Sequence, residues 1–176
     1  GSRTPIREAI RMLEQEGLAV TMPRKGAEVA KMTLKDMENV LEIRGALDEL
    51  ASQVACSRIS EEQLIRLKEC KQDFELSLKS GNVKMIAEAD VKFHDVIYEA
   101  TENPKLVSML NNLREQIYRY RIEYLKDTEI YPTLIKEHDK IYQSLVERNQ
   151  KMALESIHVH VENQANAMKE VIVKQG

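Results

Sequence analysis

The chain has few of the residues that form turns, strands and disulfide frameworks. Its 176 residues include six glycines, four prolines, two phenylalanines, two cysteines and no tryptophan. A composition so poor in glycine and proline, with 43% hydrophobic and 31% charged residues, is typical of helical proteins. The two cysteines, Cys56 and Cys70, are too few for a disulfide framework and lack the close spacing of zinc-finger ligands, so we expect buried free thiols.

Long apolar runs are also missing. No segment approaches the roughly 20 apolar residues that span a bilayer, and the N-terminus lacks the apolar core of a signal peptide. We therefore expect a soluble, cytoplasmic protein without a membrane partner.

Charge is distributed unevenly along the chain. Residues 1–32 hold six basic and four acidic residues, whereas residues 33–176 hold 20 basic and 25 acidic residues. A mildly basic head on an acidic body suits a small nucleic-acid module attached to a domain that does not touch phosphates.

The head is predicted to form a helix followed by a hairpin. Thr4-Pro5 favours the start of a helix that ends at Gly17. Two strand-like runs, 18–20 and 27–30, are joined by a turn whose basic tip is Arg24-Lys25-Gly26.

Three arginines, Arg3, Arg7 and Arg11, recur every four residues and therefore share one face of this helix. Such a face can lie in the major groove of DNA, where arginine binds phosphates or guanine edges. Spacing alone fits a solvated basic face about equally well.

A resemblance to a known family gives this segment a more specific interpretation. Residues 2–18, SRTPIREAIRMLEQEGL, closely resemble the recognition helix of GntR-family transcription regulators, and residues 24–29, RKGAEV, resemble their wing. Two further helices precede this point in that family, so the resemblance implies a partial winged helix-turn-helix DNA-binding domain at 1–32. The residues that it implies for DNA binding are Arg3, Thr4, Arg7, Arg11, Arg24, Lys25 and Gly26.

The body, residues 33–176, is predicted to be all-α, an antiparallel bundle of about six helices. Caps and breakers place the helices near 33–57, 60–80, 82–102, 104–127, 131–148 and 150–174.

Polar residues fall on the apolar stripes of these helices. Asp90 and His94, four residues apart, lie on or beside the stripe of the third body helix, and His138 lies on the stripe of the fifth. Burying a carboxylate costs several kcal/mol unless it is paired or coordinated, so these residues call for a partner. In the last helix, His158 and His160 lie on opposite flanks of the stripe, and periodicity does not choose between them.

One Asp and three His from three helices would supply ligands suited to zinc, or to nickel, manganese or iron, with coordination positions left open. Each histidine taken alone is more simply explained as an ordinary core or surface residue. The set as a whole favours a metal site.

The body resembles the FCD ligand-binding domain of FadR-subfamily GntR regulators, in its shorter, VanR-like branch with six helices. The resemblance is carried by EIRGALD at 42–48, by the Asp90-x-x-x-His94 spacing, by Glu137-His138 and by the last-helix histidine. It implies a homodimer that binds operator DNA, a small carboxylate effector, and the metal ligands Asp90, His94, His138 and His160.

A carboxylate effector would also need a cation besides the metal. Arg44 borders an apolar stripe formed by Val40, Ile43, Leu47 and Leu50, and it is the first candidate. Arg121 is the second, and a surface ion pair is an equally good explanation for either residue.

The function predicted is a transcription regulator, most simply a repressor, whose body binds a metal and a small organic acid that modulates operator binding. An alternative is a metal-responsive regulator, or a structural metal site, with no organic effector. A metal-dependent hydrolase is less consistent with the sequence because no general base accompanies the site, so the chain is predicted not to be an enzyme.

Overall fold

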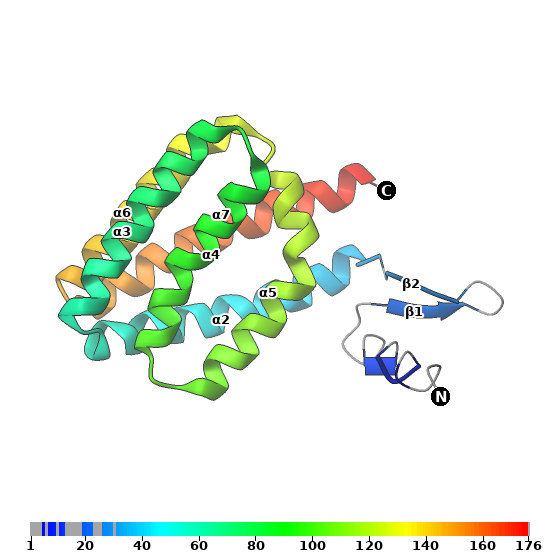
Figure 1. Cartoon of the computed structure of the whole chain (residues 1–176), viewed down its shortest axis with the longest axis horizontal. Coiled ribbons are helices and arrows are strands. Elements are labelled where there is room, and N and C mark those ends of the chain that lie inside the picture. The colour runs from blue at the N-terminus through cyan, green and yellow to red at the C-terminus, as the bar shows by residue number, and fades with distance from the viewer. Residues whose placement is uncertain are drawn as a thin grey trace.

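The computed structural model shows a bundle of six α-helices preceded by a two-stranded hairpin (Figure 1). The residues that it describes are Pro5, 7–9, 11–12, 19–22, 26–29 and 31–175, and side chains are described for all of these except 19–22 and 26–29. The helices are α2 (Leu34–Arg58), α3 (Glu61–Ser77), α4 (Val83–Ala100), α5 (Pro104–Tyr124), α6 (Tyr131–Val146) and α7 (Gln150–Gln175). The predicted six-helix, all-α body is confirmed within this part of the chain.

Side-chain caps explain where several helices begin. The Thr33 side chain accepts a hydrogen bond from the Asp36 amide, and the Asp36 side chain accepts one from the Thr33 amide in return. Ser60 and Gln63 form the same reciprocal pair at the start of α3. Short 3-10 turns, η1 (Leu78–Ser80) and η2 (Thr128–Ile130), lie after α3 and before α6.

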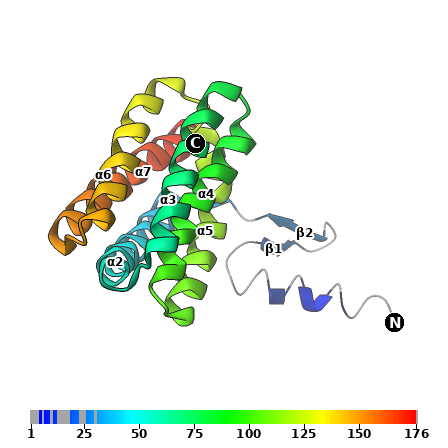
Figure 2. The same cartoon turned by 60° about the vertical axis from the view of Figure 1, so that its left-hand side comes forward.

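The hairpin consists of β1 (Ala19–Met22) and β2 (Gly26–Val29), which pair antiparallel with Ala19 opposite Val29. It lies on the α5 side of the bundle, away from α6 and α7 (Figure 2). The segment that follows is tied to α5, because the Met32 amide donates a hydrogen bond to the Tyr120 hydroxyl at 3.0 Å.

The two larger hydrophobic clusters stabilise the bundle, and a group of buried polar side chains lies where they meet. One cluster includes Phe93 and Ile141, and the other includes Phe74, Ile86 and Leu134. The buried polar side chains on α4, α6 and α7 include Asp90, His94, His138, His160 and Gln164. We call this buried polar group the polar chamber.

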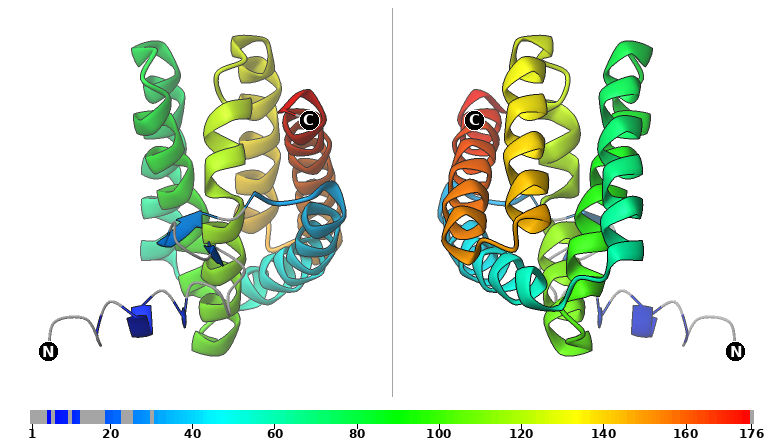
Figure 3. Two further views of the ribbon diagram at one scale, coloured as in Figure 1. Left: turned by 90° about the vertical axis from the view of Figure 1, so that its right-hand side faces the viewer. Right: turned by 90° about the vertical axis from the view of Figure 1, so that its left-hand side faces the viewer.

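Helix α2 turns a partly polar face inward. It lies obliquely across the bundle (Figure 3), and its buried face carries Met37, Leu41, Arg44 and Asp48. In the apolar stripe beside Arg44, Val40 and Leu47 are half-buried and pack against the core, whereas Ile43 is 51% and Leu50 45% exposed.

Among the helices that the structure describes, none has both the length and the apolarity to cross a membrane.

Candidate metal centre and polar chamber

Three helices bring four potential metal ligands together. Helix α4 supplies Asp90 and His94 one turn apart, α6 supplies His138 and α7 supplies His160. One ligand atom from each residue can be chosen so that all four atoms lie within 4.8 Å of one another. All four side chains are buried, and both imidazoles from α6 and α7 have no exposed surface.

The individual distances show how tightly the group converges. His138 Nε2 lies 2.9 Å and His94 Nε2 3.3 Å from Asp90 Oδ1, and His160 Nε2 lies 3.2 Å from His94 Nε2. Two imidazole lone pairs that face each other at this distance repel unless a proton or a cation lies between them. The donor set of three nitrogens and one carboxylate oxygen fits a divalent transition metal.

A hydrogen-bond chain orients one of these rings from behind. Glu137 Oε1 lies 3.2 Å from His160 Nδ1, and Glu137 Oε2 accepts a hydrogen bond from the side-chain Nδ2 of Asn163 at 2.9 Å. A carboxylate on Nδ1 favours the tautomer whose Nε2 carries a lone pair, which is the tautomer that binds metals.

Aromatic rings surround the imidazoles. Phe74 and Phe93 meet the His138 ring edge-on, with centroids 4.2 and 4.6 Å away, and Phe93 contacts His94 in the same way. These rings keep water away from the cluster, so its charges interact in a medium of low polarity.

Burial sets the charge of the ligands. It lowers the pKa of His94 to about 4, although the Asp90 carboxylate acts in the opposite direction, and it also lowers the pKa of His138. Both rings are therefore neutral near pH 7, as metal binding requires. Burial raises the pKa of Asp90, but His94 and Arg121 more than offset this and hold that pKa well below its usual range.

The two arginines predicted to bind an effector both lie in this chamber. Arg121 on α5 is 2% exposed and donates to Asp90 Oδ2. Arg44 on α2 is 4% exposed; its Nε lies 3.2 Å from Asp48 Oδ2, and its Nη2 donates to Gln164 Oε1 at 3.0 Å. Neither arginine forms the surface ion pair that the sequence left open.

Several buried donors around these arginines have no hydrogen-bond partner in the part of the chain that the structure describes. They are Arg44 Nη1, Arg121 Nε, the Tyr124 hydroxyl and Gln164 Nε2. Buried polar groups are normally satisfied, because an unpaired donor costs about 1–3 kcal/mol. Among the described residues, the acceptor Asp48 Oδ2 also lacks a hydrogen-bond partner, so unpaired donors outnumber unpaired acceptors around these arginines, which favours a ligand rich in oxygen acceptors.

The other residues singled out in the sequence lie elsewhere. His158 is exposed and contacts Glu49 and Glu162, so the structure does not bring it into the cluster. Arg7 and Arg11 are exposed on the first helical segment, and Gly26 begins β2. The DNA-binding predictions for Arg3, Thr4, Arg24 and Lys25 lie outside the described residues.

Sequence reasoning gave no individual role to Asp48, Tyr98, Tyr124 or Gln164. Two spacings could have indicated them, because Asp48 follows Arg44 by four residues and Gln164 follows His160 by four, so each shares a helix face with a candidate ligand. The same signal was present for the two tyrosines, because Tyr98 follows His94 by four residues and Tyr124 follows Arg121 by three.

Comparisons with known proteins place the chain among transcription regulators. Residues 39–163 match the FCD domain. The HTH-type transcriptional regulator YdhC of Bacillus subtilis is 27% identical over 172 residues, covering 97% of this chain and 77% of that protein. The HTH-type transcriptional repressor RspR of Escherichia coli is 23% identical over 172 residues, covering 97% and 75%. In fold, the chain is similar to E. coli McbR/YncC, with a TM-score of 0.86, 18% identity and coverage of 100% and 87%.

Proposed function

Because this chain belongs to the FCD-domain transcription regulators of the GntR family, we propose that its body senses a small organic acid through a bound divalent metal and thereby controls operator binding. Regulators of this family bind operator DNA, and the acid would release or secure that contact. The repressor RspR makes repression the simpler sense of the response.

The convergence of Asp90, His94, His138 and His160 carries this proposal. Four protein ligands fill a tetrahedral shell, as in structural zinc sites, so an acid would bind by expanding the metal's shell to five or six positions. When bound, the metal would act as a Lewis acid toward a carboxylate oxygen. Zinc is the first candidate, and nickel, manganese and iron share its preference for imidazole and carboxylate.

The chain's own contribution to acid binding is a set of fixed donors. Arg44 Nη1, Gln164 Nε2 and the Tyr124 hydroxyl are buried and without a partner among the described residues. A guanidinium matches a carboxylate in shape and charge, and in a dry chamber the pairing is stronger than in water. Arg121 would act mainly on Asp90, which its Nη2 already contacts. Its unpaired Nε is the atom that could donate to the acid.

A homodimer is the second part of the proposal. Two large apolar side chains of the α2 stripe, Ile43 and Leu50, are exposed on the surface. Isolated apolar residues are common on surfaces, but a stripe along one helix is suited to a two-fold partner. Two bodies joined in this way would set the spacing of two heads on a palindromic operator.

Regulation requires that the acid prefer one arrangement of the dimer. A ligand shifts an equilibrium only by its difference in affinity for the two states, and a coupling of roughly 1–3 kcal/mol is typical. Because the chamber is contacted by α2, α4, α5, α6 and α7, a ligand there acts on most of the bundle at once.

The deciding experiment begins with elemental analysis of the purified protein after incubation with zinc and dialysis. We expect about one zinc per chain in the wild type. We expect loss of zinc in His94→Ala but not in His158→Ala, a matched control because His158 lies outside the cluster. Calorimetric titration of small mono- and dicarboxylates into zinc-loaded and metal-free protein follows.

Acid binding by the loaded form alone supports the proposal. Zinc binding without any response to acids, together with zinc-dependent operator affinity in the full-length protein, would instead make the chain a metal-responsive regulator. If no metal binds and acids bind equally well without it, the four residues are a buried polar network and the metal proposal fails.

A further inference from the structure

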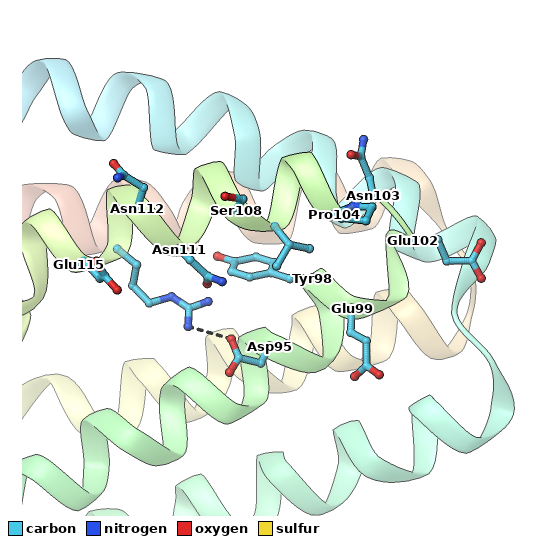
Figure 4. A pocket seen from close by; sticks show the side chains of 12 residues that line it. Asp95, Tyr98, Glu99, Glu102, Asn103, Pro104, Ser108, Asn111, Asn112 and Glu115 are labelled. Atoms are coloured by element: carbon cyan, nitrogen blue, oxygen red, sulfur yellow. Dashed lines mark hydrogen bonds and ion pairs between the residues drawn. The ribbon is translucent and has the colours of Figure 1, made fainter. Parts of the chain in front are cut away.

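Tyr98 lies at the boundary between the polar chamber and the outer surface. It projects from α4 into the floor of a groove of about 890 Å³ between α4 and α5, yet it is only 3% exposed (Figure 4). On the groove side, the Arg114 guanidinium lies 5.0 Å from the Tyr98 ring centre and donates to Asp95 at 2.8 Å. These contacts hold the ring in place.

The hydroxyl is directed inward. It donates to Asp48 Oδ1 at 2.5 Å, and the other oxygen of Asp48 lies 3.2 Å from Arg44 Nε. A chain of polar contacts therefore runs from Tyr98 on α4 through Asp48 on α2 to the arginine at the edge of the metal cluster. All three side chains are buried.

This arrangement determines which hydrogens of Arg44 remain for a ligand. The Tyr98 hydroxyl fixes Asp48 by donating to Oδ1, Asp48 Oδ2 lies 3.2 Å from Arg44 Nε, and Gln164 accepts from Nη2. Nη1 is left without a partner in the described chain.

We propose that Tyr98 is a positioning residue for the effector arginine: its hydroxyl fixes the Asp48 carboxylate against the Nε edge of Arg44, and this contact orients the guanidinium so that Nη1 stays available to a carboxylate. The inference rests on the proposed function for its ligand. Its geometry rests on this chain's own contacts.

Tyr98→Phe removes only the hydroxyl and retains the ring against Arg114. Without it, the Asp48 carboxylate can turn and Arg44 loses its fixed orientation, so we expect the zinc-loaded variant to bind malate, used as the probe acid, at least about tenfold more weakly. Zinc content should remain that of the wild type, because none of the four candidate ligands contacts the hydroxyl in the structure. Tyr118→Phe is the matched control, since Tyr118 is 40% exposed on α5.

A double variant separates positioning from loss of structure. Because Tyr98 acts through Arg44, adding Tyr98→Phe to Arg44→Lys should weaken malate binding no further. A general loosening of the fold would instead lower affinity additively and reduce zinc content. Equal malate affinity in wild type and Tyr98→Phe overturns the inference while leaving the proposed function intact.

A second readout does not depend on acid binding. The side-chain Nε–H signal of Arg44, identified by its loss in Arg44→Lys, should shift in the ¹⁵N NMR spectrum of Tyr98→Phe and stay in place in Tyr118→Phe. If malate binds neither protein, this signal decides alone. A shift supports the positioning role although the proposed acid sensor fails, and an unmoved signal overturns it.

Discussion

Arg121 and Asp90 form an ion pair in the interior of the bundle, with side chains only 2% and 4% exposed. The arginine uses Asp90 Oδ2, and the histidines of α4 and α6 approach Oδ1. The carboxylate is thus divided between a permanent cation on one oxygen and the candidate metal centre on the other.

Arg121→Met leaves the buried Asp90 carboxylate without its cation, and we expect the free energy of unfolding of the metal-free protein to fall by about 3–5 kcal/mol. Zinc should reduce the loss, because a bound cation compensates the same charge. Urea unfolding with and without zinc measures both effects.

Arg66→Gln provides the comparison. Arg66 pairs with Glu99 at 2.9 Å on the surface, where both side chains are about half exposed. Such pairs contribute about 0–1 kcal/mol, so a loss comparable to that of Arg121→Met would contradict our account of the interior pair.

Stability should depend on pH through His94. Its pKa is about 4 in the folded chain and near 6.5 when unfolded, so below pH 6.5 the unfolded state binds a proton that the folded state excludes. The stabilising contribution is complete above pH 6.5 and is lost as the pH falls toward 4. Metal-free wild type should therefore lose more stability between pH 7 and pH 4 than His94→Asn does.

His158 gives the opposite sign. Its hydrogen bond to Glu49 raises its pKa, so any contribution is present at low pH and lost as the pH rises. His158→Asn should leave the loss of stability between pH 7 and pH 4 no smaller than in the wild type. A smaller loss in this variant than in His94→Asn would mean that the buried ring is not the group responsible.

A glycine in the loop between α4 and α5 should stabilise the folded chain. Glu102 has a φ of +52°, a conformation that costs a non-glycine residue of order 1 kcal/mol, so Glu102→Gly should stabilise the chain by up to about that amount. Gly81 has a φ of +68° with open space around it, so Gly81→Ala should cost about 1 kcal/mol from the backbone alone. Thermal unfolding of both variants tests the pair.

At Arg148, replacement by glycine should have the opposite effect on stability. This residue has the same φ of +52°, but its guanidinium donates to the carbonyl oxygens of Cys56 and Ile59. Arg148→Gly relieves the backbone and removes both hydrogen bonds, so we expect a net loss of stability. A gain would show that backbone strain outweighs these contacts.

The proposed dimer can be tested on α2. Leu50→Lys places a charge in the stripe and should shift the protein from dimer to monomer in sedimentation equilibrium, with the helical content unchanged. Leu76→Lys on α3 is the control, because Leu76 is 62% exposed and lies outside the stripe. A wild type that is monomeric at all concentrations, or equal dimerisation of all three proteins, would remove α2 as the interface.

The sequence predicted the six helices to within a few residues because their ends are determined locally. Thr33, Ser60 and Asn103 cap the N-termini of α2, α3 and α5 with their own side chains, and such caps can be recognised in the sequence without tertiary information. The strands were predicted to within two residues, since the runs at 18–20 and 27–30 became Ala19–Met22 and Gly26–Val29.

The polar chamber could be predicted only in part, because some of its residues are buried through contacts between helices that are distant in the sequence. Asp90, His94 and His138 interrupt strong apolar stripes, which made them conspicuous. On α2, however, Arg44 and Asp48 occupy the inward face, and their burial depends on Tyr98 and Gln164 from distant helices. Periodicity along one helix cannot reveal such partners, nor could it choose His160 over His158.

Two consecutive residues of α5 face different parts of the molecule. Arg121 reaches the carboxylate at the centre of the bundle, and Tyr120 receives the amide of Met32, where the chain arrives from the hairpin. Both residues belong to one helix, so any rotation of α5 about its long axis displaces the two contacts together. Helix α5 thus connects the central Asp90 carboxylate mechanically to the segment that follows the hairpin.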